Sequence, residues 1–204
     1  MSSESSPRQE FWNTRYSGSE YVYGTEPNEY FKEKIDNLEP GFLLLPAEGE
    51  GRNAVYAARS GWTVEAYDFS EMAQNKALQL AHSNGMEIQY QLTDHRFVQY
   101  SSHQFSAIAL IFVHLPSEFR GSFHKRVISW LQPGGTIILE AYSKNQIQYK
   151  SGGPQNPDLL YDLKVLERDF ADLESTQFTE LVRPLREGQC HRGFGSVVRL
   201  LGKK

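Results

Sequence analysis

Short apolar runs alternate with longer helix-like segments through the middle of the chain. The strand-like runs are 42–45, 62–68, 86–91, 105–115 and 136–142. The helix-like segments between them are 52–60, 70–83 and 117–131. Because the run 105–115 is almost entirely apolar, it is typical of a central strand in a parallel sheet. The alternation as a whole predicts a doubly wound α/β sheet.

Both ends of the chain depart from this alternation. Residues 7–17 place aromatic and basic side chains at helical spacing, and Pro27 is suited to begin a second helix. After a predicted helix near 162–171, two strand-like runs, 175–185 and 190–201, are separated only by REGQ. We therefore expect a mostly parallel, seven-stranded sheet that ends in an antiparallel hairpin.

Length and composition indicate one domain, residues 1–204, with residues 1–6 as a disordered tail. The net charge of −4 argues against a nucleic-acid partner. No apolar run approaches the ~18 residues of a membrane span, and the first residues lack a leader-like apolar segment. The lone cysteine, Cys190, excludes an internal disulfide, and no residue spacing supports a metal site. A cytoplasmic protein without a membrane partner is expected.

The stretch LLLPAEGEGRNA, residues 43–54, leads from a predicted strand into a predicted helix. Gly49 and Gly51 would let the backbone approach a ligand, and a helix N-terminus offers free N–H groups. Asp68 ends the next strand, where a carboxylate can bind both ribose hydroxyls. A tight turn also explains the glycines alone, but together with Asp68 they favour a nucleoside-containing cofactor. Asp94, after the third strand, is either an acceptor for an adenine amino group or a solvated turn residue.

The segment GEGRNA also fits the pattern G-x-G-x-x-A, so a nicotinamide dinucleotide is an alternative cofactor. A dehydrogenase would normally need a second region for its substrate. Little chain remains after the predicted sheet to form one.

Several segments together resemble the class I S-adenosylmethionine-dependent methyltransferases, and within them the tellurite-resistance/thiopurine-methyltransferase-like group. The resemblance covers nearly the whole chain. It is carried by FWNTRYSGSEYVYGTEPNEYF, GEGRNAVYAARSGWTVEAYDFS, IFVHLP, LQPGGTIILEAYS, GGPQNPDLLY and HRGFGSVVRLL. It implies a Rossmann-like methyltransferase fold, S-adenosyl-L-methionine as cofactor, and residues 7–38 as a helical cover over the cofactor site.

The resemblance also implies which residues bind the cofactor. They are Arg15, Tyr23, Gly49, Gly51, Asn53, Asp68, Ser70, Asp94, Phe97 and Phe112. Within this set, Arg15 and Tyr23 belong to the N-terminal cover, Asp94 and Phe97 lie beside the adenine, and Asn53 caps a helix.

The first half of the loop departs from the usual pattern of the family, acid-Leu-Gly-small-Gly. The usual strand-end acid is replaced by Leu45, and the first glycine is replaced by Ala47. Pro46 between them stiffens the strand exit. Glu48 either supplies the missing carboxylate or is an exposed loop residue.

Methyl transfer requires mainly alignment of the nucleophile and exclusion of water. A thiolate or chalcogenide needs no strong base, whereas an amine or hydroxyl does. His114, at the end of the fourth strand, is one candidate catalytic residue. The terminal hairpin offers further catalytic candidates, namely His191, Arg192 and Arg199. With Arg183 and Arg186 the hairpin forms either a cationic rim for an anionic acceptor or ordinary solvated charge. The remaining histidines are expected on helix or turn surfaces: His82, His95, His103 and His124.

The resulting hypothesis is S-adenosylmethionine-dependent methyl transfer to a small nucleophile, a thiol or chalcogen compound. The alternatives are an NAD(P)-binding oxidoreductase and a non-catalytic S-adenosylmethionine-binding protein. The Gly/Pro-rich loop 143–160 is expected to act as a lid over a small-molecule pocket. The acceptor and the oligomeric state are not specified by the sequence.

Overall fold

The computed structural model describes residues 6–204. Residues 1–5 of the predicted tail lie outside this part of the chain. The last residue of the predicted tail, Ser6, is the N-cap of helix α1 (Pro7–Tyr16), and its hydroxyl accepts a hydrogen bond from the backbone N–H of Gln9. Ser6 therefore belongs to the folded domain, because its hydroxyl satisfies a free N–H group at the start of the helix.

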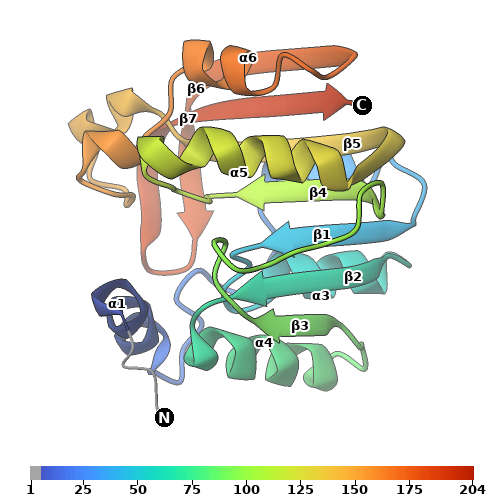
Figure 1. The fold of residues 1–204 in the computed structure, drawn as a ribbon. Helices are drawn as coiled ribbons and strands as arrows, with labels where there is room; N and C mark the ends of the chain where they lie inside the picture. Colours follow the sequence, from blue (N-terminus) through green and yellow to red (C-terminus); the bar gives the residue numbers. More distant parts are fainter. Residues whose placement is uncertain (1–5) are drawn as a thin grey trace.

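One sheet of seven strands forms the centre of the fold, in the order β3-β2-β1-β4-β5-β7-β6 (Figure 1). The strands are β1 (Phe42–Pro46), β2 (Thr63–Asp68), β3 (Gln89–Leu92), β4 (Phe105–Ile111), β5 (Leu131–Tyr142), β6 (Ser175–Glu187) and β7 (His191–Lys203). β1 to β5 are parallel, and β7 lies antiparallel between β5 and β6. The predicted parallel sheet with a terminal hairpin is confirmed.

Helices flank the sheet on both faces. They are α2 (Glu29–Ile35), α3 (Arg52–Arg59), α4 (Glu71–Ser83), α5 (Ser117–Trp130) and α6 (Leu163–Asp169), with 3₁₀ turns η1 (Lys144–Gln148) and η2 (Pro157–Leu159). Ser70 caps α4 by accepting from the N–H of Ala73, as its position predicts. Among residues 6–204, every helix is too short or too polar to cross a membrane.

The alternation of strand side chains divides the core into two layers. On β1, Leu43 and Leu45 pack with α2 and α3, whereas Leu44 packs on the opposite face with α5 and α6. All three leucines are almost completely buried. Each contributes about 1.5–3 kcal/mol by burial, so the register of this strand is strongly fixed.

Two strands end in residues with left-handed backbone. Ala47 follows β1 with φ of 51°, and Phe112 follows β4 with φ of 53°. The predicted strand 105–115 therefore stops at Ile111, because the turn at Phe112 takes the chain out of the sheet. Non-glycine residues rarely adopt this conformation, and such positions concentrate at functional sites. Both turns lie at the carboxyl ends of the strands, the edge beside which α1 lies in Figure 1.

Candidate active site

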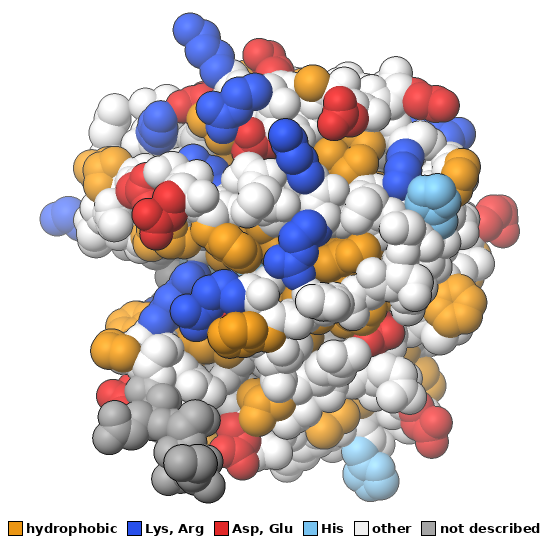
Figure 2. All heavy atoms as spheres, in the orientation of Figure 1, with side chains coloured by type: hydrophobic (Ala, Val, Ile, Leu, Met, Phe, Trp, Pro, Cys, Tyr) orange, Lys and Arg blue, Asp and Glu red, His pale blue; other side chains and the backbone are white. Residues whose placement is uncertain are grey.

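A cavity of about 410 Å³ opens at the carboxyl ends of the parallel strands. Residues of α1 and Tyr23 cover one side, and His191 of β7 with Gly153 and Pro154 of the loop after η1 cover the other. Figure 2 shows a hollow on the left of the molecule with basic side chains beside it. The cavity has an acid-lined half, containing Glu48 and Asp68. It also has a ring-lined half, formed by Tyr23, Phe112, His114, Tyr142 and His191.

The loop between β1 and α3 requires glycine at two positions. Gly49 has φ of 66° and Gly51 has φ of 89°. A Cβ on Gly51 would approach the backbone and side chain of Ala77 to 2.8 Å, and one on Gly49 would meet the hydroxyl of Tyr16 at 3.0 Å. Neither glycine lines the cavity, so both shape the loop from behind by allowing α4 and α1 to pack closely against it.

Glu48 is buried and holds the start of α3. Its Oε1 accepts hydrogen bonds from the backbone N–H groups of Asn53, at 2.7 Å, and Ala54, at 2.8 Å, and its Oε2 accepts from Asn53 Nδ2 at 3.1 Å. Burial raises the pKa of Glu48 to about 7, although these hydrogen bonds oppose the shift. The helix cap predicted for Asn53 is therefore supplied by Glu48. Asn53 Oδ1 instead accepts from the N–H of Asn28.

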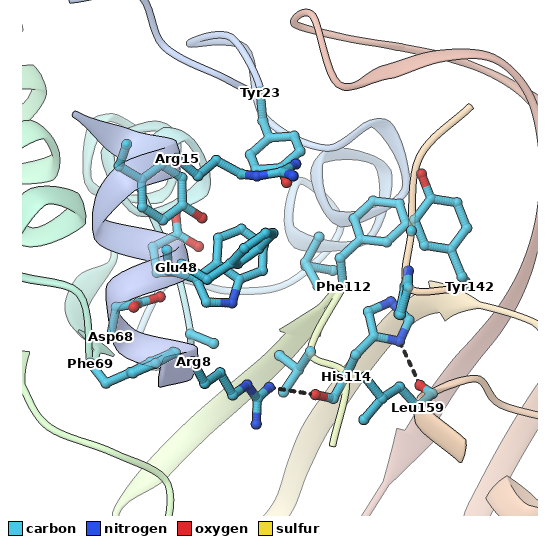
Figure 3. A pocket seen from close by; sticks show the side chains of 18 of the residues that line it. Arg8, Arg15, Tyr23, Glu48, Asp68, Phe69, Phe112, His114, Tyr142 and Leu159 are labelled. Carbon is cyan, nitrogen blue, oxygen red and sulfur yellow. Dashed lines mark hydrogen bonds between the residues drawn. The ribbon is translucent and has the colours of Figure 1, made fainter. Parts of the chain in front are cut away.

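Asp68 ends β2 and connects it to the loop. Its Oδ2 accepts from the N–H of Gly49 at 3.3 Å, and its Oδ1 accepts from the N–H of Ser70 at 2.9 Å. Burial raises the pKa of Asp68 to about 6. Figure 3 shows the carboxylates of Asp68 and Glu48 on the same side of the cavity.

Helix α1 brings two arginines to the cavity. Arg15 lies over the ring of Phe11, 4.9 Å from its centre, and beside Tyr23 in Figure 3. Arg8 donates from Nη2 to the backbone carbonyl of His114 at 2.8 Å. Within residues 6–204, neither guanidinium has a carboxylate within ion-pair distance. The cover thus places positive charge over an otherwise acidic and aromatic cavity.

The ring-lined half is built from four elements that are distant in sequence. The imidazole of His191 lies 4.5 Å, between ring centres, from both Phe112 and Tyr23. His114 stacks on Tyr142 at 5.7 Å with 18° between the ring planes. These contacts fix the orientation of both imidazoles within an apolar wall.

His191 is held by a carboxylate that the sequence reasoning missed. Its Nδ1 lies 2.9 Å from Glu187 Oε2, which also accepts from Arg52 Nη2 at 3.0 Å, while Glu187 Oε1 accepts from Asn28 Nδ2 at 2.9 Å. Burial alone would raise the pKa of Glu187, but Arg52 and His191 hold it at about 2. The ionised carboxylate keeps the proton of the neutral imidazole on Nδ1, which leaves a lone pair on Nε2.

His114 is the second fixed imidazole. Its Nδ1 lies 2.8 Å from the carbonyl oxygen of Leu159 (Figure 3). A carbonyl only accepts, so Nδ1 carries the hydrogen and Nε2 carries the lone pair. This Nε2 is buried and has no hydrogen-bond partner among the described residues. Burial lowers the pKa of His114 to about 4, which keeps the ring neutral near pH 7.

Comparison with protein-family models finds one family that matches the central part of the chain. A methyltransferase-domain family model matches residues 46–135, from the end of β1 into β5. Residues 46–135 thus match a methyltransferase domain, in agreement with the methyltransferase expected from the sequence. The glycine loop, Glu48 and Asp68 all lie inside the matched segment, as do Phe112 and His114 of the ring-lined half. No curated protein matches the sequence significantly.

Solved structures resemble this methyltransferase in fold. One was determined in work on the conversion of a disulfide bond into a thioacetal group during echinomycin biosynthesis; the TM-score is 0.74 at 16% identity, covering 96% of this chain and 90% of that one. TehB from Haemophilus influenzae gives 0.72 at 17% identity, covering 97% and 67%.

A third structure is that of a Haemonchus contortus phosphoethanolamine N-methyltransferase in complex with phosphomonomethylethanolamine and S-adenosylhomocysteine. It gives a TM-score of 0.64 at 17% identity, and the match covers 83% of this chain but only 43% of that one. At identities this low, these likenesses establish the fold, and the family model establishes the methyltransferase domain.

The cavity residues fit S-adenosylmethionine. The buried Asp68 carboxylate lies at the strand end where a ribose-binding acid is expected, and it keeps lone pairs beyond its two backbone hydrogen bonds. The loop that carries Glu48 packs closely against α4 and α1 because Gly49 and Gly51 lack a Cβ. The cationic and aromatic cover lies opposite. The nicotinamide alternative is not favoured, since the family match is to methyltransferases.

Most predicted site residues come together at the cavity. Those that line it are Arg15, Tyr23, Glu48, Asn53, Asp68, Phe112, His114 and His191. Ser70 lies behind it, where it caps α4 and donates from Oγ to Asn13 Oδ1. Arg8 and Trp12 line the cavity without having been predicted as site residues, whereas Gly153, Pro154 and Leu159 belong to the loop that was predicted to cover the pocket.

The predicted adenine-side residues do not reach the cavity. The carboxylate of Asp94 is bound by Arg96, with Nε at 2.9 Å, and Phe97 is 72% exposed. The side chain of this segment that does line the cavity is His95, which is 5% exposed and lies 3.0 Å from the hydroxyl of Tyr67. The expectation of a surface His95 was wrong, because the turn after β3 points it inward.

The predicted cationic rim of the hairpin is also absent from the cavity. Arg192 is exposed, as is Arg186. Arg199 and Arg183 both bind Glu140, at 2.6 Å each, so their charge is neutralised inside the fold. Burial of a charge requires such a partner.

His124, expected at the surface, is instead fully buried, with Nδ1 2.9 Å from an Asp169 oxygen. The exposed positions of α5 therefore lie on a different face of this helix.

Proposed function

We propose that this methyltransferase acts on a small thiol or other chalcogen nucleophile, which binds in the ring-lined half of the cavity. The observation that carries the proposal is His191. Its imidazole faces the cavity, its tautomer is fixed by Glu187, and aromatic rings surround it. A soft nucleophile fits such an apolar environment, and a neutral imidazole suffices to take its proton.

The acid-lined half would hold the cofactor. Asp68 would bind the ribose hydroxyls, Glu48 orders the loop by capping α3, and Arg15 with Tyr23 would cover the charged end of the cofactor. When bound, S-adenosylmethionine supplies a methyl group on a sulfonium sulfur, and the co-product is S-adenosylhomocysteine.

The role assigned to His191 is that of a general base. Burial lowers the pKa of His191, and Glu187 partly offsets this. An imidazole backed by a carboxylate can hold the proton that the acceptor loses as the new carbon–sulfur bond forms. Arg192 and Arg199 are not assigned a catalytic role, because the first is exposed and the second is paired with Glu140.

An oxyanion acceptor is disfavoured by the same arrangement. A small dianion would need unpaired cations in the ring-lined half. The hairpin cations Arg183 and Arg199 are committed to Glu140, and the unpaired Arg8 and Arg15 belong to the cover on α1, where they would face the cofactor. A neutral thiol needs no such cation.

The loop 143–160 supports a small acceptor. Gly153, Pro154 and Leu159 line the cavity, so this segment closes its ring-lined half. A cavity of about 410 Å³ holds a nucleoside cofactor with only a small additional molecule.

Calorimetry followed by a transfer assay tests the proposal. S-adenosylhomocysteine should bind while NAD does not, and Asp68→Asn should weaken this binding about 100-fold, since a buried charged partner is worth about 2–5 kcal/mol. The loaded protein should then methylate members of a panel of small thiols and selenols. Binding without methylation of any panel member would favour a non-catalytic sensor, and absence of binding would reject the cofactor site.

A further inference from the structure

The ring-lined half contains two neutral imidazoles with different supports. Nδ1 of His191 is hydrogen-bonded to the ionised carboxylate of Glu187, whereas Nδ1 of His114 is hydrogen-bonded only to the carbonyl of Leu159. A carboxylate stabilises an imidazolium and a carbonyl does so far less. His191 can therefore hold a proton taken from sulfur, and His114 can only accept a hydrogen bond.

The unsatisfied atom of this pair is Nε2 of His114. It is buried, lacks a partner among residues 6–204 and belongs to a side chain that lines the cavity. A buried acceptor without a donor costs about 1–3 kcal/mol, which a ligand recovers by supplying the donor. Since a thiol has a single S–H hydrogen, and His191 takes it, the donor for His114 must come from another group of the acceptor.

We propose that the methyl acceptor is bifunctional: it carries an O–H or N–H donor close to its nucleophilic sulfur, and Nε2 of His114 binds that donor. His114 is then a specificity-determining residue of the proposed thiol methylation, on which this inference rests. In the reaction the S–H bond breaks, its proton goes to His191 Nε2, and the sulfur gains the methyl group while the donor stays bound to His114.

The surroundings of His114 keep it in the accepting state. The ring stacks on Tyr142, and its own backbone carbonyl accepts from Arg8. Titratable and charged groups that face it from the neighbouring elements are Arg8 of α1, Arg120 of α5, Tyr142 of β5, Tyr161 of the segment before α6, and His191 of β7. None of these is a carboxylate; the carbonyl of Leu159 alone favours the protonated form, and burial outweighs it.

Matched aromatic thiols test the proposal by binding alone. The three positional isomers of mercaptophenol each carry a hydroxyl donor, and their methyl ethers keep the oxygen but lose the hydrogen. Dissociation constants are measured calorimetrically on the protein loaded with S-adenosylhomocysteine. At least one hydroxyl isomer should bind about 10-fold more tightly than its methyl ether, the scale expected for one satisfied hydrogen bond.

The variant His114→Phe keeps a flat ring but removes the acceptor. It should bind hydroxyl and methoxy isomers equally, with unchanged affinity for S-adenosylhomocysteine as proof of folding. His82→Phe, on the exposed face of α4, is the matched control and should keep the wild-type preference. A preference that survives in His114→Phe, or a wild-type protein with no preference in any pair, would overturn the inference.

Nitrogen NMR of the histidine rings gives a readout that does not depend on folding of a variant. Nε2 of His114 should report as unprotonated between pH 5 and 8 and should shift when the preferred isomer is added. A protonated Nε2, or no shift on saturation, counts against the proposal. Failure of the proposed function is distinguishable, because it would show as absent binding of S-adenosylhomocysteine or as absent methylation of every thiol.

Discussion

The acid-lined and ring-lined halves of the cavity respond to burial in opposite chemical directions. Burial raises the pKa of Glu48 to about 7 and that of Asp68 to about 6. In the ring-lined half, burial lowers the pKa of His114 to about 4 and also lowers that of His191. One physical cause, the cost of a charge away from water, therefore drives both halves toward neutrality.

The halves differ in how their polar atoms are satisfied. Both oxygens of Glu48 and Asp68 accept hydrogen bonds from the loop and helix that they organise. The imidazoles each use one nitrogen for internal support and leave Nε2 to the cavity. The carboxylates of the acid-lined half are thus fixed in place from both oxygens before any ligand arrives, while Nε2 of His114 in the ring-lined half has no partner among the described residues.

The largest effect is expected from His191→Asn. The asparagine amide can still donate to Glu187 but has no group at the position of Nε2. Removal of a general base costs about 10²–10⁴ in rate, so kcat should fall about 1,000-fold. The affinity for S-adenosylhomocysteine, measured by calorimetry, should stay unchanged. A loss of both kcat and affinity for S-adenosylhomocysteine would show that the two halves of the cavity do not act independently.

The acid-lined half predicts a stability that falls as pH rises. The pKa of Glu48 is raised by burial to about 7, so the folded protein binds its proton more tightly than the unfolded chain. Stability then decreases from about pH 4.5 to about pH 7, by roughly 3 kcal/mol for this residue. In Glu48→Gln this decrease should flatten in urea unfolding measured across that range. If the free energy of unfolding depended on pH in the same way in Glu48→Gln, burial would not raise the pKa of Glu48.

Glu187, behind the ring-lined half, should make the free energy of unfolding rise with pH, opposite to the effect of Glu48. Its pKa is held at about 2, so its stabilising contribution is full above about pH 4.5 and is lost as the pH falls toward 2. Glu187→Gln should lower the free energy of unfolding at pH 7 by about 2 kcal/mol, less than the full pKa effect because the amide keeps part of the hydrogen bonding. Urea titrations at pH 3 and pH 7 should show the deficit shrinking at the lower pH.

The smallest effect is expected from Arg192→Ala. This side chain is exposed and lies outside the cavity, so stability should change by less than about 0.5 kcal/mol. Thiol binding and kcat should stay within about twofold of the wild type. A large loss of kcat in a steady-state assay would show that the hairpin moves toward the acceptor during catalysis.

Local sequence features were sufficient to predict the sheet and the glycine-containing loop between β1 and α3. The apolar runs gave the parallel strands because a strand buried on both faces must be apolar along its length. Gly49, Gly51 and Asp68 were recognisable because a close backbone approach and a strand-end acid occur within one short segment.

Ion pairs between side chains were not predictable in the same way. Asp94 was assigned to the cofactor from its position, but Arg96, two residues on, neutralises it. Arg199 was assigned to the acceptor, but Glu140 on the neighbouring strand binds it. In both cases a carboxylate–guanidinium pair occupies the side chain that was predicted to bind a ligand. Such pairing depends on which side chains the fold brings within hydrogen-bond distance.

The sequence by itself thus determined the fold, the family resemblance and the place of the cofactor loop, because these depend on periodicity and on residues close together in the chain. Only the tertiary structure decided what Glu48 does, which histidines face the cavity and which nitrogen of each is free. Glu187 and Leu159 fix those nitrogens from segments separated from the cofactor loop by more than a hundred residues in the sequence. A tautomer is set by the partner on the other side of the ring. Leu159 lies 45 residues from His114, whereas Glu187 lies four residues from His191 and reaches it through the register of the β6–β7 hairpin.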